Sequence, residues 1–129
     1  MYEILNQVTA ELTSETSLFA LTTTEVNGIE VKSFALAPPT LRDVWSLTEP
    51  HADKNYIIYE DERWLYKDAH AEVASIGNWL LANGVEPGDR IAIAMRNFPE
   101  WTLAYWGAVN VGVAVVGVNA WWIEEELAF

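Results

Sequence analysis

A run of 23 residues without a charged side chain, Trp101–Ile123, constrains this sequence more than any other feature. A membrane-spanning helix needs about 20 apolar residues, and tryptophans at both ends of the run are typical of a membrane interface. The run is interrupted by small or polar residues: Gly107, Asn110, Gly112, Gly117 and Asn119. Because Gly112 stands where a helix would end, the pattern favours a buried helix followed by a buried strand. A membrane-anchored protein is the alternative.

The flanking residues extend this pattern to a strand–helix–strand unit. The apolar run Ile91–Met95 is typical of a parallel strand that is covered on both faces. Pro99 suits the first turn of a helix, which we predict over residues 99–111. We expect residues 90–95 and 113–118 to be adjacent parallel strands joined by a right-handed crossover. The predicted fold class is therefore α/β.

The clearest helical pattern covers residues 67–83. Its apolar residues form one stripe at spacings of three and four: Ala69, Val73, Ile76 and Leu80. Gly84 then predicts a left-handed C-terminal cap, with Val85 placed for the accompanying apolar contact. The sequence Glu86-Pro87-Gly88-Asp89 predicts a type II turn.

The N-terminal residues predict a smaller helix-and-hairpin region. Residues 1–12 suit a short helix, and Asn27-Gly28 predicts the turn of a hairpin whose strands cover 18–26 and 29–34. We therefore divide the chain into residues 1–36, a helix and a hairpin, and residues 37–129, an incomplete α/β subdomain.

The second region begins with three further local predictions. Thr40 predicts a helix start with Asp43 three residues on, and Pro50 is expected to end that helix. Strands are expected at 56–59 and 64–66, separated by a charged turn at 60–63. A last helix is expected over Ile123–Phe129, with glutamates in its first turn.

The charge balance excludes several classes of partner. The chain has 129 residues and a net charge of −12, from 7 basic and 19 acidic residues. Such a chain repels nucleic acids and anionic membrane surfaces. It has no cysteine, so disulfides and thiolate zinc sites are excluded. The N-terminus has no basic stretch followed by a long apolar run, so we expect no signal peptide and a cytoplasmic protein.

Candidate chemical groups are few. The acidic clusters Glu60-Asp61-Glu62 and Glu124-Glu125-Glu126 favour solvated surface over metal binding. His51 and His70 have no second ligand at metal spacing, so we expect structural or solvent roles for both. The run Thr22–Thr24 lacks the glycines and lysine of a phosphate loop and is interpreted as strand. We therefore assign no catalytic, cofactor-binding or metal-ligating residue.

Several ordered motifs nevertheless resemble a known family. They cover residues 59–66, 83–93, 95–101, 106–119 and 124–129. In this order and spacing they resemble the N-terminal part of AMP-forming acyl-CoA synthetases of the adenylate-forming superfamily. Residues 37–43 resemble the entry helix of bacterial fatty-acyl-CoA ligases. The chain departs from the family pattern at Leu65, where threonine is frequent, and at Gly117 and Ala120, where prolines are frequent.

The resemblance implies a reaction and also where its machinery lies. Family members use ATP and Mg²⁺ to convert a carboxylic acid into an acyl-adenylate, which coenzyme A then attacks. The groups that do this lie in the family beyond the part matched here, so the resemblance gives no catalytic residue. We expect an inactive, structural N-terminal fragment of a long- or medium-chain fatty-acid–CoA ligase. The whole enzyme would use fatty acid, ATP, Mg²⁺ and coenzyme A, and it could lie at the membrane periphery.

Two other interpretations remain open. An aryl-CoA ligase or an adenylation domain belongs to the same superfamily, and this segment separates these poorly. A free-standing acidic interaction module would use the tryptophan-rich C-terminal residues as its binding surface. If the chain is a fragment, its uncovered apolar helix and strand should make it self-associate.

Overall fold

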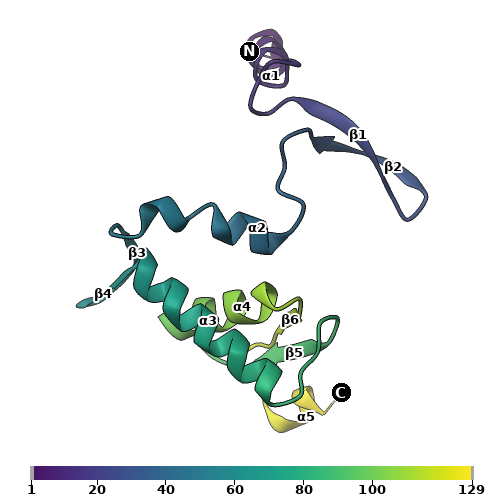
Figure 1. The fold of residues 1–129 in the computed structure, drawn as a ribbon. Coiled ribbons are helices and arrows are strands. Elements are labelled where there is room, and N and C mark those ends of the chain that lie inside the picture. The colour runs from purple at the N-terminus through teal and green to yellow at the C-terminus, as the bar shows by residue number, and fades with distance from the viewer. Residues whose placement is uncertain (1, 129) are drawn as a thin grey trace. The chain divides into compact units, whose positions relative to one another are not determined.

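The computed structural model describes residues 2–128, which form a mixed α/β structure (Figure 1). The elements, in chain order, are α1 (Tyr2–Leu12), β1 (Leu21–Val26), β2 (Ile29–Phe34), α2 (Leu41–Ser46), the 3₁₀ helix η1 (Glu49–His51), β3 (Asn55–Tyr59), β4 (Glu62–Leu65), α3 (Tyr66–Ala82), β5 (Arg90–Ile93), α4 (Pro99–Asn110), β6 (Ala114–Gly117) and α5 (Glu124–Leu127). The chain divides into two compact units between Pro39 and Thr40.

The first unit contains α1 and an antiparallel hairpin of β1 and β2. The predicted helix is confirmed from Tyr2, while Met1 lies outside the described residues. Asn27 and Gly28 form the turn with φ of 51° and 79°, the positive values that a two-residue type I′ turn requires. The first strand begins at Leu21 rather than at Leu18, because the preceding residues form a turn.

The second unit opens with a capped helix. Thr40 and Asp43 form a capping box: the Asp43 N–H donates to the Thr40 hydroxyl at 3.2 Å, and the Thr40 N–H donates to the Asp43 carboxylate at 3.1 Å. The expectation that Pro50 ends this helix is wrong, because α2 already ends at Ser46. Pro50 instead lies in the first turn of η1, where its missing N–H is tolerated.

Strands β3 and β4 form a second antiparallel hairpin. Tyr59 pairs with Glu62, so the turn contains only Glu60 and Asp61, and the predicted four-residue turn is too long. Arg63 is already paired with Ile58 as strand. The charges of 62–63 suggested a loop, but exposed positions of a hairpin accept polar side chains.

Helix α3 confirms the predicted apolar stripe, since Ala69, Val73 and Leu80 are buried. It ends in a Schellman motif, in which the Val85 N–H donates to the Leu80 carbonyl and the Gly84 N–H to the Leu81 carbonyl, both at 3.1 Å. The φ of Gly84 is 85°. The predicted left-handed cap is therefore confirmed.

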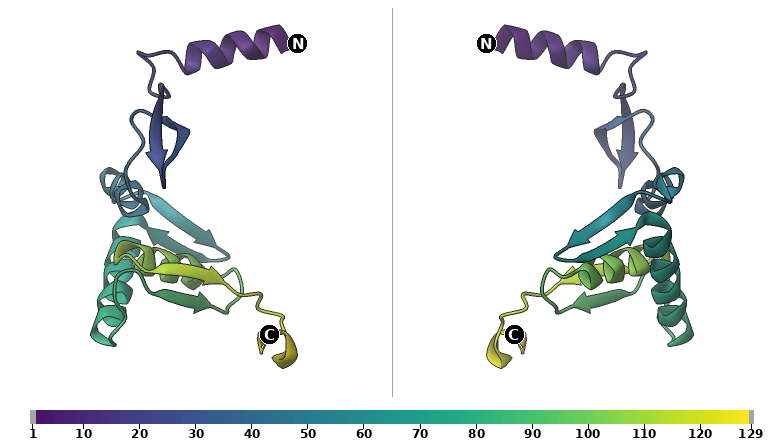
Figure 2. Two further views of the ribbon diagram at one scale, coloured as in Figure 1. Left: turned by 90° about the vertical axis from the view of Figure 1, so that its right-hand side faces the viewer. Right: turned by 90° about the vertical axis from the view of Figure 1, so that its left-hand side faces the viewer.

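Strands β5 and β6 are parallel and are joined through α4, as predicted (Figure 2). Each has four residues, and the register runs from Arg90↔Ala114 to Ile93↔Gly117, so both are shorter than expected. The turns at their amino ends are joined, since the Gly88 N–H donates to the Gly112 carbonyl and the Ala114 N–H to the Asp89 carbonyl, both at 2.8 Å. Helix α4 ends in the same motif as α3.

The uncharged run thus divides into most of α4, a turn, strand β6 and a following loop. Within residues 2–128, no helix is both long and apolar enough to cross a membrane. The last helix, α5, covers Glu124–Leu127, and Phe129, which was included in the prediction, lies outside the described residues.

Two apolar clusters make up the core of the second unit. The first contains Trp45, Ala69, Val73 and Leu103, and the second contains Leu80, Ala108 and Val113. Half-buried Ile76 packs against both clusters. Helices α3 and α4 approach closely at Gly77 and Gly107: a Cβ added to Gly107 would lie 2.5 Å from Ile76 Cγ2. These glycines bring the two helices into contact beside the β5–β6 pair.

Candidate functional site

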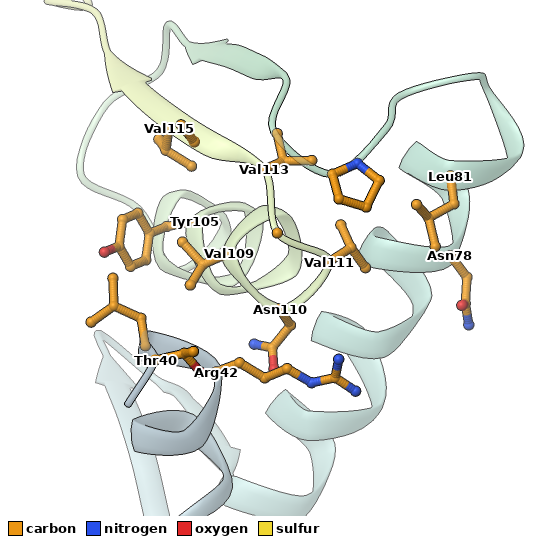
Figure 3. A pocket seen from close by; sticks show the side chains of 14 residues that line it. Thr40, Arg42, Asn78, Leu81, Tyr105, Val109, Asn110, Val111, Val113 and Val115 are labelled. Atoms are coloured by element: carbon orange, nitrogen blue, oxygen red, sulfur yellow. The ribbon is translucent and has the colours of Figure 1, made fainter. Parts of the chain in front are cut away.

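The second unit has an open groove of about 970 Å³. Its lining comes from α2, α3, α4, β6 and the turns beside them: Thr40, Leu41, Arg42, Asn78, Leu81, Pro87, Tyr105, Val109, Asn110, Val111, Gly112, Val113, Ala114 and Val115. In the view of Figure 3, the four valine side chains lie between Tyr105 and Leu81. Arg42 is the cation of this lining, and Asn78 and Asn110 add amides. The groove is therefore an apolar surface with a few polar groups.

A cluster of aromatic rings surrounds Trp45 of α2 in the first core cluster. Trp45, which is 3% exposed, stacks against Trp106 with ring centroids 5.0 Å apart, and its ring is tilted by 31° against that of His70 at 4.3 Å. The Trp106 Nε1–H donates to the Tyr56 hydroxyl at 2.9 Å. Burial raises the pKa of Tyr56 above its ordinary value, the hydrogen bond from Trp106 lowers it, and Tyr66 adds a smaller increase. These rings join α2, β3, α3 and α4.

His70 has a structural environment. The Thr48 hydroxyl donates to the Trp45 carbonyl at 2.7 Å, which leaves its oxygen free to accept from His70 Nε2 at 2.8 Å. His70 lies near the start of α3, and it contacts Trp45 of α2 and the Thr48 hydroxyl just after α2. His51 is exposed at the end of η1, with its ring 5.8 Å from that of Tyr66.

The acidic clusters lie where the sequence suggested. Glu60, Asp61 and Glu62 are exposed at the β3–β4 turn. Glu124–Glu126 form the first turn of α5, where the Glu126 carboxylate accepts from the Ile123 N–H at 3.0 Å. Among residues 2–128, no group of three or more acidic or histidine side chains could hold a metal ion. Thr22–Thr24 lie in β1, which confirms their interpretation as strand.

Neither the groove nor the aromatic cluster could be predicted from the sequence. Trp45, Tyr56, His70 and Trp106 are far apart in the sequence, and no local spacing links them. The predicted helices give only a partial signal. The helix expected after Thr40 carries Trp45 among its apolar residues, but the partner of that ring depends on how the helices cross.

A comparison with known protein families identifies the family of this chain. Residues 44–129 match the family described as AMP-binding enzyme. The chain belongs to this family. Its resemblance to adenylate-forming CoA ligases is thereby confirmed, and the matched residues include both parallel strands and both long helices of the second unit.

Curated relatives match in the same way. The crotonobetaine/carnitine–CoA ligase of Citrobacter koseri is 30% identical over 95 residues, which cover 69% of this chain and 18% of that protein. The corresponding ligase of Salmonella paratyphi A is also 30% identical over 95 residues. The chain thus spans less than a fifth of the length of these relatives.

Solved structures share the fold. An anthranilate CoA ligase in complex with anthranoyl-AMP matches with a TM-score of 0.65 and 24% identity, covering 68% of this chain and 17% of that chain. The N-terminal subdomain of NpsA from Klebsiella oxytoca, in complex with 3-hydroxyanthranilyl-AMSN, has a TM-score of 0.66 and 19% identity. It covers 69% of this chain and 23% of that subdomain. The second unit therefore has the fold found in N-terminal subdomains of adenylate-forming enzymes.

Proposed function

We propose that this chain forms the opening part of a longer acid–CoA ligase, which uses ATP to convert a carboxylic acid into an acyl-adenylate and then transfers the acyl group to coenzyme A. The observation that carries this proposal is the family match over residues 44–129. Those residues contain helices α3 and α4, strands β5 and β6, and both apolar core clusters. Their role is to support the sheet of the larger domain.

The described residues are poorly suited to hold ATP and Mg²⁺ themselves. A triphosphate needs clustered N–H donors or converging cations. The basic residues are dispersed along the chain: Lys32, Arg42, Lys54, Arg63, Lys67, Arg90 and Arg96. At the start of α4, Pro99 lacks an N–H and Glu100 adds a carboxylate, while three glutamates occupy the start of α5. We therefore propose that ATP and Mg²⁺ bind to other parts of the longer enzyme.

For the acid substrate we propose a long- or medium-chain fatty acid. The support is the resemblance of residues 37–43 to the entry helix of bacterial fatty-acyl-CoA ligases. Another carboxylic acid is the second candidate, because the similar proteins include ligases named for carnitine and for anthranilate. The reaction needs ATP and coenzyme A as cosubstrates, which favours a cytoplasmic location, and cell fractionation tests that.

One assay on two proteins tests the function. The 129-residue chain and the longer enzyme that contains it are compared in ATP–pyrophosphate exchange with fatty acids, carnitine and benzoates, and ATP·Mg²⁺ binding is measured by calorimetry. We expect the longer enzyme to exchange with fatty acids and the short chain to show neither exchange nor binding. Turnover by the short chain would overturn the supporting role. A longer enzyme that is inactive with every acid would overturn the ligase function.

We also propose that the 129-residue chain self-associates. Trp121 is 69% exposed and Val116 on β6 is 48% exposed, and within residues 2–128 β5 and β6 form a sheet of two strands. Parallel sheets normally have more strands and cover on both faces, and uncovered edges pair with other chains. Light scattering should detect dimers or larger species that bind a hydrophobic dye. A monodisperse monomer without dye binding would contradict this.

A further inference from the structure

The sequence contains two Asn–Gly dipeptides, Asn27-Gly28 and Asn83-Gly84. Such pairs can lose ammonia because glycine has no side chain to shield its backbone nitrogen. That nitrogen attacks the asparagine Cγ, the new N–Cγ bond closes a succinimide ring, and the Cγ–Nδ2 bond breaks as ammonia leaves with the amide proton. Water then opens the ring at either carbonyl, giving aspartate or isoaspartate. The reaction needs a free glycine N–H and a backbone that can bend into the ring.

Asn27-Gly28 meets both requirements. Both residues are exposed, and within residues 2–128 neither the Asn27 side chain nor the Gly28 N–H has a hydrogen-bond partner. No residue of β1 or β2 is buried. A two-stranded hairpin of this kind is marginally stable in water, so it opens locally far more often than a packed element does. Frequent opening gives the backbone the conformations that ring closure needs.

Asn83-Gly84 is equally exposed but chemically restrained. The Gly84 N–H donates to the Leu81 carbonyl at 3.1 Å, and Asn83 Nδ2 donates to the Trp79 carbonyl at 2.8 Å. The next residue, Val85, is bonded to the Leu80 carbonyl and packs against the second core cluster. Attack at this site would first require unwinding the end of α3.

We infer that Asn27 is a site of spontaneous deamidation in the native chain and that the cap of α3 protects Asn83 from the same reaction. The consequence for the hairpin is electrostatic and geometric. Glu25 and Glu30 are directly opposite each other beside the turn, so a third carboxylate at position 27 adds repulsion. Isoaspartate also adds one carbon to the backbone of the turn. Because the two-residue turn fixes the register, the longer backbone disturbs the pairing of β1 with β2.

Ageing the whole chain in buffer and in denaturant tests this inference. Peptide mass spectrometry follows amide loss at both sites, and the denatured sample gives each site its own reference rate. We expect native Asn27 to react within about threefold of its denatured rate, and native Asn83 to be slowed by more than about tenfold. Equal slowing at both sites, or faster loss at Asn83, would overturn the inference.

Two variants give a matched control. In Asn27→Ser the early acidic species should be absent from ion-exchange profiles of aged protein, whereas in Asn83→Ser it should form as in the parent sequence. Serine cannot form the succinimide by loss of ammonia, so folding of the hairpin does not affect the readout. An acidic species that persists in Asn27→Ser and vanishes in Asn83→Ser would reverse the assignment.

Discussion

Helices α1 and α3 are both amphipathic, yet they differ completely in burial. No residue of α1 is buried, and Ile4 and Leu5 are 67% and 56% exposed. Helix α3 buries four residues of its stripe side: Ala69, Val73, Gly77 and Leu80. An apolar stripe therefore predicts the helix in both units, while the core depends on a second helix that comes close, as α4 does at the paired glycines.

The two hairpins repeat this contrast. Strands β1 and β2 bury no side chain, whereas Ile57 of β3 and Trp64 of β4 pack against the first core cluster. Both turns are two residues long and both contain a non-glycine residue with positive φ, Asn27 or Glu60. Local turn chemistry thus forms a hairpin in either setting, but only contacts from elsewhere in the chain hold its side chains in a core.

The largest test of this contrast compares one aromatic side chain from each unit. Trp45→Ala should lower the free energy of unfolding by about 4 kcal/mol, because it empties the centre of the first cluster. Phe34→Ala, at a side chain that is 51% exposed, should change it by less than about 1 kcal/mol. Denaturant titration followed by circular dichroism measures both. Equal losses would remove the distinction between the units.

The next test concerns the close approach of α3 and α4. Gly107→Ala should destabilise the second unit by about 2–3 kcal/mol, because the new Cβ would lie 2.5 Å from Ile76 Cγ2. Gly117→Ala is the control, since the nearest atom to its Cβ would be Trp101 Cζ2 at 3.8 Å. The control should stay within about 0.5 kcal/mol of the parent chain. A harmless Gly107→Ala would contradict the packing described.

A smaller effect is expected at the start of the second unit. Thr40→Ala removes the hydroxyl that accepts from the Asp43 N–H, and should cost about 1 kcal/mol. Thr40→Ser retains the oxygen and should recover most of that loss. The same denaturant titration measures both variants. If serine behaved like alanine, lost packing of the methyl group rather than capping would explain the result.

The smallest effect depends on pH. Burial raises the pKa of Tyr56, so the unfolded chain ionises this group first as pH rises. Its contribution to stability is complete below the unfolded pKa of about 10 and is lost as pH rises through the folded pKa. Unfolding midpoints measured from neutral to alkaline pH should fall less steeply in Tyr56→Phe. Parallel slopes in the two proteins would contradict this.

Local features of the fold could be predicted from the sequence because neighbouring residues encode them. Caps at Thr40 and Gly84, the α3 stripe and the parallel pair of strands depend on spacings of a few residues. The end of α2 and the length of the β3–β4 turn were predicted wrongly, because charge and proline mark loops only on average. Burial could be predicted for α3 but not for α1, since both helices carry an apolar stripe and only that of α3 is buried.

The candidate site could not be predicted from the sequence. The groove forms between Arg42 on α2, Asn78 on α3 and Val115 on β6, and no short motif joins them. The family could be predicted, because its motifs are ordered along the chain. Fatty-acid specificity, inactivity of the 129 residues and self-association stay predictions, since they depend on parts or assemblies beyond the residues that carry those motifs.

The joined turns before β5 and β6 have a consequence for engineering. The Gly88 N–H donates to the Gly112 carbonyl, and the Asp89 carbonyl accepts from the Ala114 N–H. Two backbone hydrogen bonds therefore join the Glu86–Asp89 turn to the residues at the start of β6. An inserted tag or a new chain terminus there would separate the starts of both strands and disturb their register. The Asn27-Gly28 tip has no such attachment within residues 2–128, so an insertion there would alter the register of this exposed hairpin alone and leave both core clusters unchanged. Labels and fusion partners are therefore best introduced at the hairpin.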